Sequence, residues 1–118
     1  MAAAYTIARI PRITAAAGAV DRLGALAAPF VDGRPVLLVA DPGLRPSGTV
    51  ARVEAALRAA DLDVVLFDDI RSDPSTAQTD RAASLARDCG AAAVVAVGGG
   101  SALDLGKAVA ALAPDHAP

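Results

Sequence analysis

Three short runs of mostly apolar residues constrain the fold of this chain more than any other feature. They lie at 35–40, 63–67 and 92–97, and none of them alternates polar with apolar residues. Continuous apolar runs of this length are typical of strands that are covered on both faces, as in a parallel sheet. The sequence therefore predicts three buried strands.

The stretches between and after these runs have the spacing of amphipathic helices. Apolar residues recur at steps of three and four at about 50–60, at 76–89 and at 101–112. Gly90 follows the second segment, where a glycine in the left-handed conformation commonly ends a helix. The alternation of strand and helix predicts an α/β fold with right-handed crossovers. The residues expected to face the core are Val50, Val53, Leu57, Ala60, Ala82, Leu85, Ala86, Cys89, Leu105, Ala108, Val109 and Leu112.

The segment ahead of the first apolar run is less regular. Residues 5–14 are expected to form one or two short strands, and residues 19–31 a helix. Pro29 is expected to interrupt this helix, because proline has no backbone N–H to donate.

Composition narrows the classes of partner. The 118 residues suffice for one domain, and 54% of them are hydrophobic, which is typical of a chain that forms a core. The net charge is −2 and there is no basic block, which argues against nucleic acid or an anionic membrane as the main partner. Only 3% of the residues are aromatic, which excludes a stacking platform for single-stranded nucleic acid.

The single cysteine and the apolar runs bear on the compartment. Cys89 alone excludes an internal disulfide framework and a thiolate metal cluster, which favours a reducing compartment. Residues 1–9 lack the basic and apolar regions of a signal peptide. The longest uncharged run, 89–103, is shorter than the ~20 residues that a membrane span needs. We therefore expect a soluble, cytoplasmic protein.

The most informative stretch is the glycine-rich loop after the third apolar run. Gly98, Gly99 and Gly100 follow the strand directly, and a helix is expected to begin near Ser101. Ligands of parallel α/β sheets bind at this carboxyl edge, and the free N–H groups of a helix N-terminus favour a phosphate. The alternative is a tight turn in which Ser101 caps the helix and Asp104 completes a capping box. Three consecutive glycines favour close approach of a ligand.

Two better-known phosphate loops do not fit this stretch. A Walker A loop has four residues between its glycines and a hydroxyl residue after its lysine, whereas five residues separate Gly100 from Gly106 and Ala108 follows Lys107. The dinucleotide fingerprint G-x-G-x-x-G fails because Leu103 stands at its third glycine.

Carboxylates follow the first two predicted strands. Asp41 either accepts hydrogen bonds from an adenosine ribose, which would favour NAD over NADP, or begins the turn at Pro42 and Gly43. Asp68 and Asp69 resemble the acidic pair of a phosphate-receiving module, but a solvated turn explains them better, because that pocket also needs a lysine at a strand end.

The chain resembles the iron-containing (group III) alcohol dehydrogenases. Residues 96–110 (AVGGGSALDLGKAVA) match that family's G-G-G-S-x-x-D-x-x-K-x-x-A segment. Residues 38–44 (LVADPGL) resemble the family's strand end, and residues 16–23 (AAGAVDRL) its N-terminal G-x-G-x-x-x-x-L segment, with Ala16 in place of the first glycine.

The resemblance implies a Rossmann-like parallel sheet with helices on both faces, so that residues 1–118 are the N-terminal part of a nicotinamide-dinucleotide-binding domain. It implies that Gly99, Gly100 and Ser101 bind the diphosphate and that Asp41 binds the adenosine ribose. Asp104 would then lie near the nicotinamide. Lys107 would be either the i,i+3 partner of Asp104 or a charge near the phosphates.

The resemblance also implies what this chain does not hold. Family members are several times longer, and their divalent metal, iron or zinc, lies in a C-terminal helical domain that has no counterpart here. No catalytic or metal-binding residue is expected in this chain; His116 is interpreted as a tail residue. Asp73-Pro74-Ser75 stands where family members commonly have Asn-Pro-Thr, which weakens the expectation of a cofactor contact there.

The function implied is the cofactor-binding portion of a metal-dependent, NAD(P)-linked alcohol dehydrogenase, inactive as the isolated chain. Its partners would be a nicotinamide dinucleotide and, in a full-length parent, a small alcohol or aldehyde. The alternatives are a glycerol dehydrogenase, a maleylacetate reductase, a relative of dehydroquinate synthase, or a non-catalytic phosphate-binding module. Because a fragment would leave a sheet edge and apolar area around residues 26–30 exposed, we expect self-association.

Overall fold

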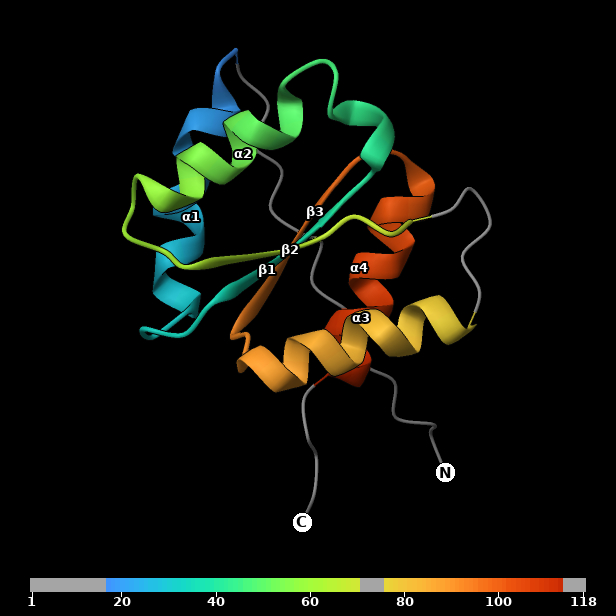
Figure 1. Ribbon diagram of the computed structural model, residues 1–118. Coiled ribbons are helices and arrows are strands. Elements are labelled where there is room, and N and C mark those ends of the chain that lie inside the picture. The colour runs from blue at the N-terminus through green and yellow to red at the C-terminus, as the bar shows by residue number, and fades with distance from the viewer. Residues whose placement is uncertain (1–16, 71–75, 114–118) are drawn as a thin grey trace, which may run out of the picture.

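The computed structural model describes residues 17–70 and 76–113, which form a parallel sheet between helices (Figure 1). Short 3-10 helices (η) accompany the α-helices. In chain order the elements are η1 (Ala19–Arg22), α1 (Leu23–Ala27), η2 (Ala28–Phe30), β1 (Val36–Ala40), η3 (Pro42–Leu44), α2 (Thr49–Arg58), β2 (Val64–Phe67), α3 (Thr76–Cys89), β3 (Ala93–Val97) and α4 (Gly100–Leu112).

The sheet has the strand order β2-β1-β3, and both pairs are parallel. Val36 pairs with Val64 on one side and with Ala93 on the other. All five residues of β1 are fully buried, because this strand has a neighbour on each edge and helices over both faces. The three predicted strands and the parallel sheet are thus confirmed.

Successive residues of β1 point to two separate cores. Leu38 packs in one cluster with Val53 and Leu57 of α2 and with Ala27 of α1. Leu37 packs in the other cluster, which contains buried residues of α3 and α4. In Figure 1, α1 and α2 accordingly lie on one side of the strands and α3 and α4 on the other. The prediction of helices on both faces is confirmed.

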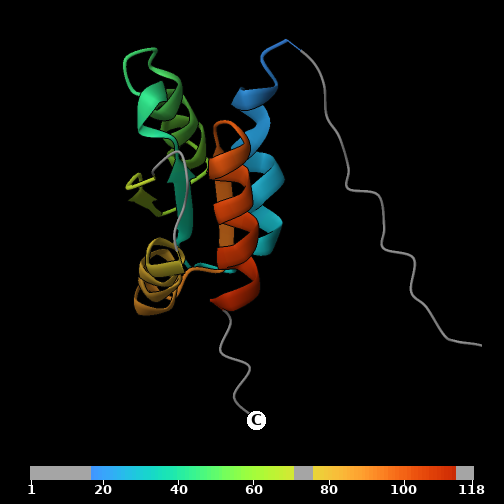
Figure 2. The ribbon, with the colours of Figure 1, turned by 90° about the vertical axis from the view of Figure 1, so that its right-hand side faces the viewer.

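The helix α4 packs closely on the sheet through a glycine that its apolar pattern did not include. Its buried residues are Ala102, Leu105, Gly106 and Val109. A Cβ at Gly106 would lie only 2.8 Å from the Cβ of Ala96, so this glycine faces β3 directly. Figure 2 shows α4 in front of β3, the strand that it follows. The prediction that Leu112 faces the core is wrong, because its side chain lies at the end of the helix and is 53% exposed.

The helices α2 and α3 agree with the predicted ranges, with small differences in their faces. On α2, Val50, Val53 and Leu57 are buried as expected. On α3, Leu85 and Cys89 are only half-buried, whereas Ala83, which was not predicted, is buried. Gly90 has φ +70°, which confirms the left-handed end of α3.

The segment predicted as one helix interrupted at Pro29 is divided into η1, α1 and η2, with Pro29 in the first turn of η2. The short α1 packs closely on α2, because a Cβ at Gly24 would lie 2.5 Å from the carbonyl oxygen of Ala56. Phe30 is 70% exposed, as expected of an uncovered surface. The predicted strands at 5–14 lie outside the described residues.

Among the described residues, none of the helices is both long and apolar enough to cross a bilayer.

Candidate functional site

The loops that follow β1 and β3 lie side by side. The backbone N–H of Asp41 donates a hydrogen bond of 3.1 Å to the carbonyl oxygen of Val97. The helix that follows β1 packs on one face of the sheet, whereas the helix that follows β3 packs on the other. The two chain directions therefore diverge between these strands. In open α/β sheets, such a switch point forms the crevice in which ligands bind.

Gly98, the first residue of the glycine-rich loop, is required by the fold. Its φ is +144°, and a Cβ there would lie 2.8 Å from the Cβ of Asp41 and 2.9 Å from the Cβ of Ala102. No side chain fits at this position without moving its neighbours. Gly98 thus allows the two loops to approach each other.

Gly99 and Gly100 differ from Gly98, because the fold does not require them. Both are exposed, and a Cβ at either position would have no atom within 4 Å among those compared. Gly99 has extended backbone (φ −82°, ψ −163°), and no side chain caps α4. Within the described residues, no acceptor is recorded for the N–H groups of Gly99 and Gly100. These amides belong to the N-terminus of a helix, where an anion is favoured.

The capping box that was the alternative explanation of this loop is not found in the structure. Gly99, not Ser101, is the N-cap residue, so that Ser101 is the second and Asp104 the fifth residue of the helix. The half-buried Ser101 remains in the first turn, next to the two glycines.

Asp104 and Lys107 lie on α4, and both are exposed. The ion pairs found among the described residues do not include this pair, so the first of the two roles expected of Lys107 is not observed. An exposed pair of this kind gains little energy, and both side chains remain solvated.

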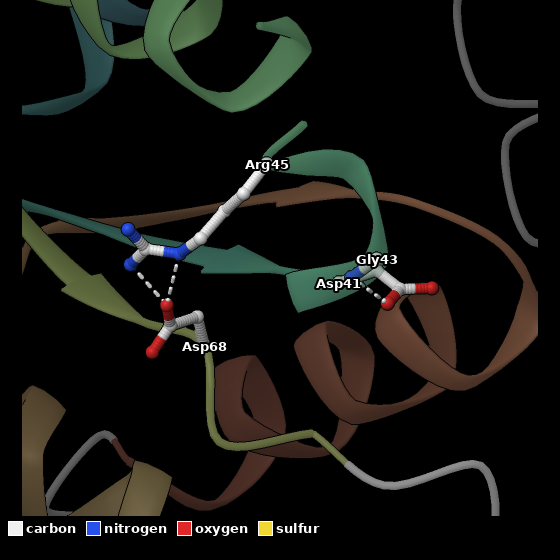
Figure 3. Close-up of polar contacts among 4 residues, drawn as sticks. All are labelled: Asp41, Gly43, Arg45 and Asp68. Carbon is white, nitrogen blue, oxygen red and sulfur yellow. Dashed lines mark hydrogen bonds and ion pairs between the residues drawn. The ribbon is translucent and has the colours of Figure 1, made fainter. Parts of the chain in front are cut away.

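Asp41 has one carboxylate oxygen engaged in its own turn. Its Oδ1 accepts a hydrogen bond of 2.9 Å from the N–H of Gly43, which caps η3 (Figure 3). Its Oδ2 has no recorded partner among the described residues. The turn role weighed for Asp41 is therefore real, and it leaves a second oxygen available to a ligand.

Asp68 and Asp69 do not form a merely solvated turn. Asp68 is paired with Arg45, which comes from the end of η3, and Asp69 is paired with Arg81 of α3. Each carboxylate therefore connects the end of β2 to another element. Because both acids are engaged by arginines and Lys107 lies on a helix, the site does not match a phosphate-receiving acidic pocket.

Two features next to the loop were not predicted from the sequence. One is Arg45, whose partner is 23 residues away in the chain. The other is an apolar cavity of about 400 Å³ between α1, β3 and the start of α4, which reaches Gly98. The exposed Leu26 and Leu103 line this cavity.

The remaining positions of interest do not add to the site. The Asp73-Pro74-Ser75 stretch and His116 lie outside the described residues. Within the described ranges, no three His, Cys, Asp or Glu side chains come together in a way that could hold a metal ion.

Comparisons with known proteins agree on one family. The family model for iron-containing alcohol dehydrogenases matches residues 11–117. A 4-hydroxybutyrate dehydrogenase from Cupriavidus necator is 42% identical over 77 residues, which are 65% of this chain and 20% of that enzyme. An alcohol dehydrogenase 4 from Saccharomyces cerevisiae is 35% identical over 82 residues, 70% of this chain and 22% of that enzyme.

Solved structures of the same family share the fold. The NADH-dependent butanol dehydrogenase A from Thermotoga maritima superposes with a TM-score of 0.76 at 26% identity, over 85% of this chain and 25% of that chain. The chain thus spans about a fifth to a quarter of the length of the relatives it matches. The match of the family model over residues 11–117 shows that the chain belongs to the iron-containing alcohol dehydrogenase family.

Proposed function

We propose that residues 1–118 form the N-terminal part of a nicotinamide-dinucleotide-binding domain, in an enzyme that transfers a hydride between an alcohol and NAD. The relatives are dehydrogenases, and one of them is named as NADH-dependent. A sulfoacetaldehyde reductase from Bifidobacterium kashiwanohense, whose structure was solved with NAD⁺, matches with a TM-score of 0.67 at 29% identity. The matched region is 78% of this chain and 24% of the reductase chain.

The observation that carries the proposal is the uncapped N-terminus of α4 beside Asp41. The N–H groups of Gly99, Gly100 and Ser101 are proposed to hold the diphosphate, because the dipole of a helix favours an anion at its N-terminus. The open space at Gly99 and Gly100 supports close approach of an anion to the backbone.

Asp41 is proposed to bind the adenosine ribose through the oxygen that its own turn leaves available. A carboxylate there accepts hydrogen bonds from ribose hydroxyls and repels a 2′-phosphate, which favours NAD over NADP. Asp104 is proposed to lie toward the nicotinamide, and Lys107 to contribute a positive charge near the phosphates.

The described residues do not fit an iron or zinc site, since they contain no cluster of metal-ligating side chains. Because the chain spans only about a fifth to a quarter of the length of its relatives, we propose that the metal ligands and the pocket for a small alcohol or aldehyde lie outside these 118 residues. When bound, a nicotinamide would supply the hydride acceptor, and the residues of this chain would hold and orient it. We therefore propose that the 118-residue chain binds the dinucleotide without turnover.

Gly100→Ala tests the diphosphate site. The added methyl group meets no atom of another element within 4 Å, and alanine favours a helix, so the variant should fold at least as well as the parent chain. The same methyl group enters the space proposed for the diphosphate. We expect the affinity for NADH and for ADP-ribose, measured by calorimetry, to fall about tenfold, which corresponds to ~1.4 kcal/mol.

The matched control is Ala111→Ser, an exposed change at the other end of α4. It should leave both affinities unchanged. The proposal would be contradicted if Gly100→Ala bound both compounds as tightly as the parent chain. It would also be contradicted if the parent chain bound neither compound. The same samples should show no reduction of NAD with a primary alcohol and added Fe²⁺ or Zn²⁺.

A further inference from the structure

The ion pair between Arg45 and Asp68 connects the end of η3 to the end of β2. Both Nε and Nη2 of Arg45 donate to Asp68 Oδ2, the first at 2.7 Å. The side chain of Arg45 is 54% exposed and that of Asp68 33% exposed. Nη1 of Arg45 has no recorded partner among the described residues. The guanidinium is thus held in one place, yet it remains accessible to solvent.

Arg45 belongs to the same turn as Asp41. The carbonyl oxygen of Asp41 accepts a hydrogen bond from Leu44, and that of Pro42 accepts one from Arg45. The turn therefore carries both the carboxylate proposed to bind the ribose and a cation close to it in the chain. Figure 3 shows the side chain of Arg45 extending away from Asp41 and toward Asp68.

We propose that Asp68 is a positioning residue for cofactor selection, which holds Arg45 away from the ribose site and so maintains discrimination against a 2′-phosphate. This inference rests on the proposed dinucleotide function. An arginine near the ribose accommodates the 2′-phosphate of NADP, whereas a lone carboxylate repels it. With Asp68 in place, the positive charge of Arg45 is compensated, and Asp41 alone sets the charge beside the ribose.

Removal of Asp68 and removal of Arg45 should change the selectivity for the cofactor in opposite directions. Asp68→Asn releases the guanidinium, and we expect it then to turn toward a 2′-phosphate. Arg45→Gln leaves Asp68 uncompensated and makes the electrostatic potential around the turn more negative. Because loss of an exposed ion pair has little effect on folding, both variants should remain folded. A mere loss of stability would not shift the two variants in opposite directions.

The experiment measures the affinities of the 118-residue chain for ADP-ribose and for its 2′-phosphorylated form by calorimetry. The readout is the ratio of the two dissociation constants, and folding is checked by circular dichroism. We expect Asp68→Asn to reduce the preference for ADP-ribose about fivefold and Arg45→Gln to increase it, in line with a charge interaction near the protein surface. In the double variant, the reduction in preference that Asp68→Asn causes should disappear, because no guanidinium is left to redirect.

Asp69→Asn is the matched control. It removes one carboxylate from the neighbouring residue, but it releases Arg81 of α3 instead of Arg45. Its ratio should stay at that of the parent chain. An equal shift in both Asn variants would show that net charge alone is responsible, and an unchanged ratio in Asp68→Asn would show that Arg45 is not redirected. Either result overturns the inference while leaving the proposed function intact. Absence of ADP-ribose binding to the parent chain would overturn both.

Discussion

The loops after β1 and β3 end neighbouring strands at the same edge of the sheet, but they are built in opposite ways. The loop after β1 is held by internal hydrogen bonds, since Asp41 caps η3 and Arg45 is fixed by Asp68. The loop after β3 has backbone amides at Gly99 and Gly100 with no recorded partner among the described residues. One loop supplies fixed side chains, and the other supplies available backbone donors.

The three consecutive glycines of the loop after β3 have two different roles. Gly98 is required because the loops would otherwise collide, whereas Gly99 and Gly100 have open space around them. A glycine that the fold does not require leaves the backbone open to close approach of a ligand, such as a bound anion.

The largest effect is expected from breaking the contact between the two loops. In Gly98→Ala, the methyl group would approach Asp41 and Ala102 to within 3 Å, at a φ that alanine rarely adopts. We expect the free energy of unfolding to fall by about 2–4 kcal/mol, measured by urea denaturation.

Gly33→Ala is the control for Gly98→Ala, because it has φ +75° and no atom within 4 Å of the added Cβ. It carries a milder strain of positive φ without the collision, and should cost only about 1 kcal/mol. Equal losses in the two variants would mean that the loops do not contact each other as described.

A smaller effect is expected from the loop after β1. Asp41→Ala removes the cap of η3 and should lower the free energy of unfolding by about 1 kcal/mol, whereas Asp41→Asn keeps a capping oxygen and should be nearly neutral. The two variants should differ in thermal denaturation. Equal melting temperatures would show that the hydrogen bond to Gly43 contributes nothing to stability.

The smallest effect has the opposite sign. Gly100→Ala should raise the free energy of unfolding by roughly 0.5 kcal/mol, because alanine loses less conformational freedom in a helix. Urea denaturation without ligand measures this gain. A loss of stability would show that the fold itself requires Gly100, and the contrast with Gly98 would then fail.

Much of the architecture follows from local sequence patterns. Uninterrupted apolar runs predicted each strand to within one residue at its ends, because strands covered on both faces contain few polar residues. The spacing at 76–89 predicted α3 over its full range. The three glycines after the third run indicated a phosphate loop, because glycine has a distinctive backbone chemistry that is visible without any coordinates.

Long-range contacts decided the rest. The strand order β2-β1-β3 brings Asp41 beside Val97 and Arg45 beside Asp68, and no local pattern specifies which strands are neighbours. The close approach of α4 to Ala96 buries Gly106, which the apolar pattern did not include, and Leu112 is exposed because it lies at the end of the helix. Local patterns report the conformation that each segment favours, whereas the roles of Gly98 and Arg45 depend on atoms that only the packed sheet brings together.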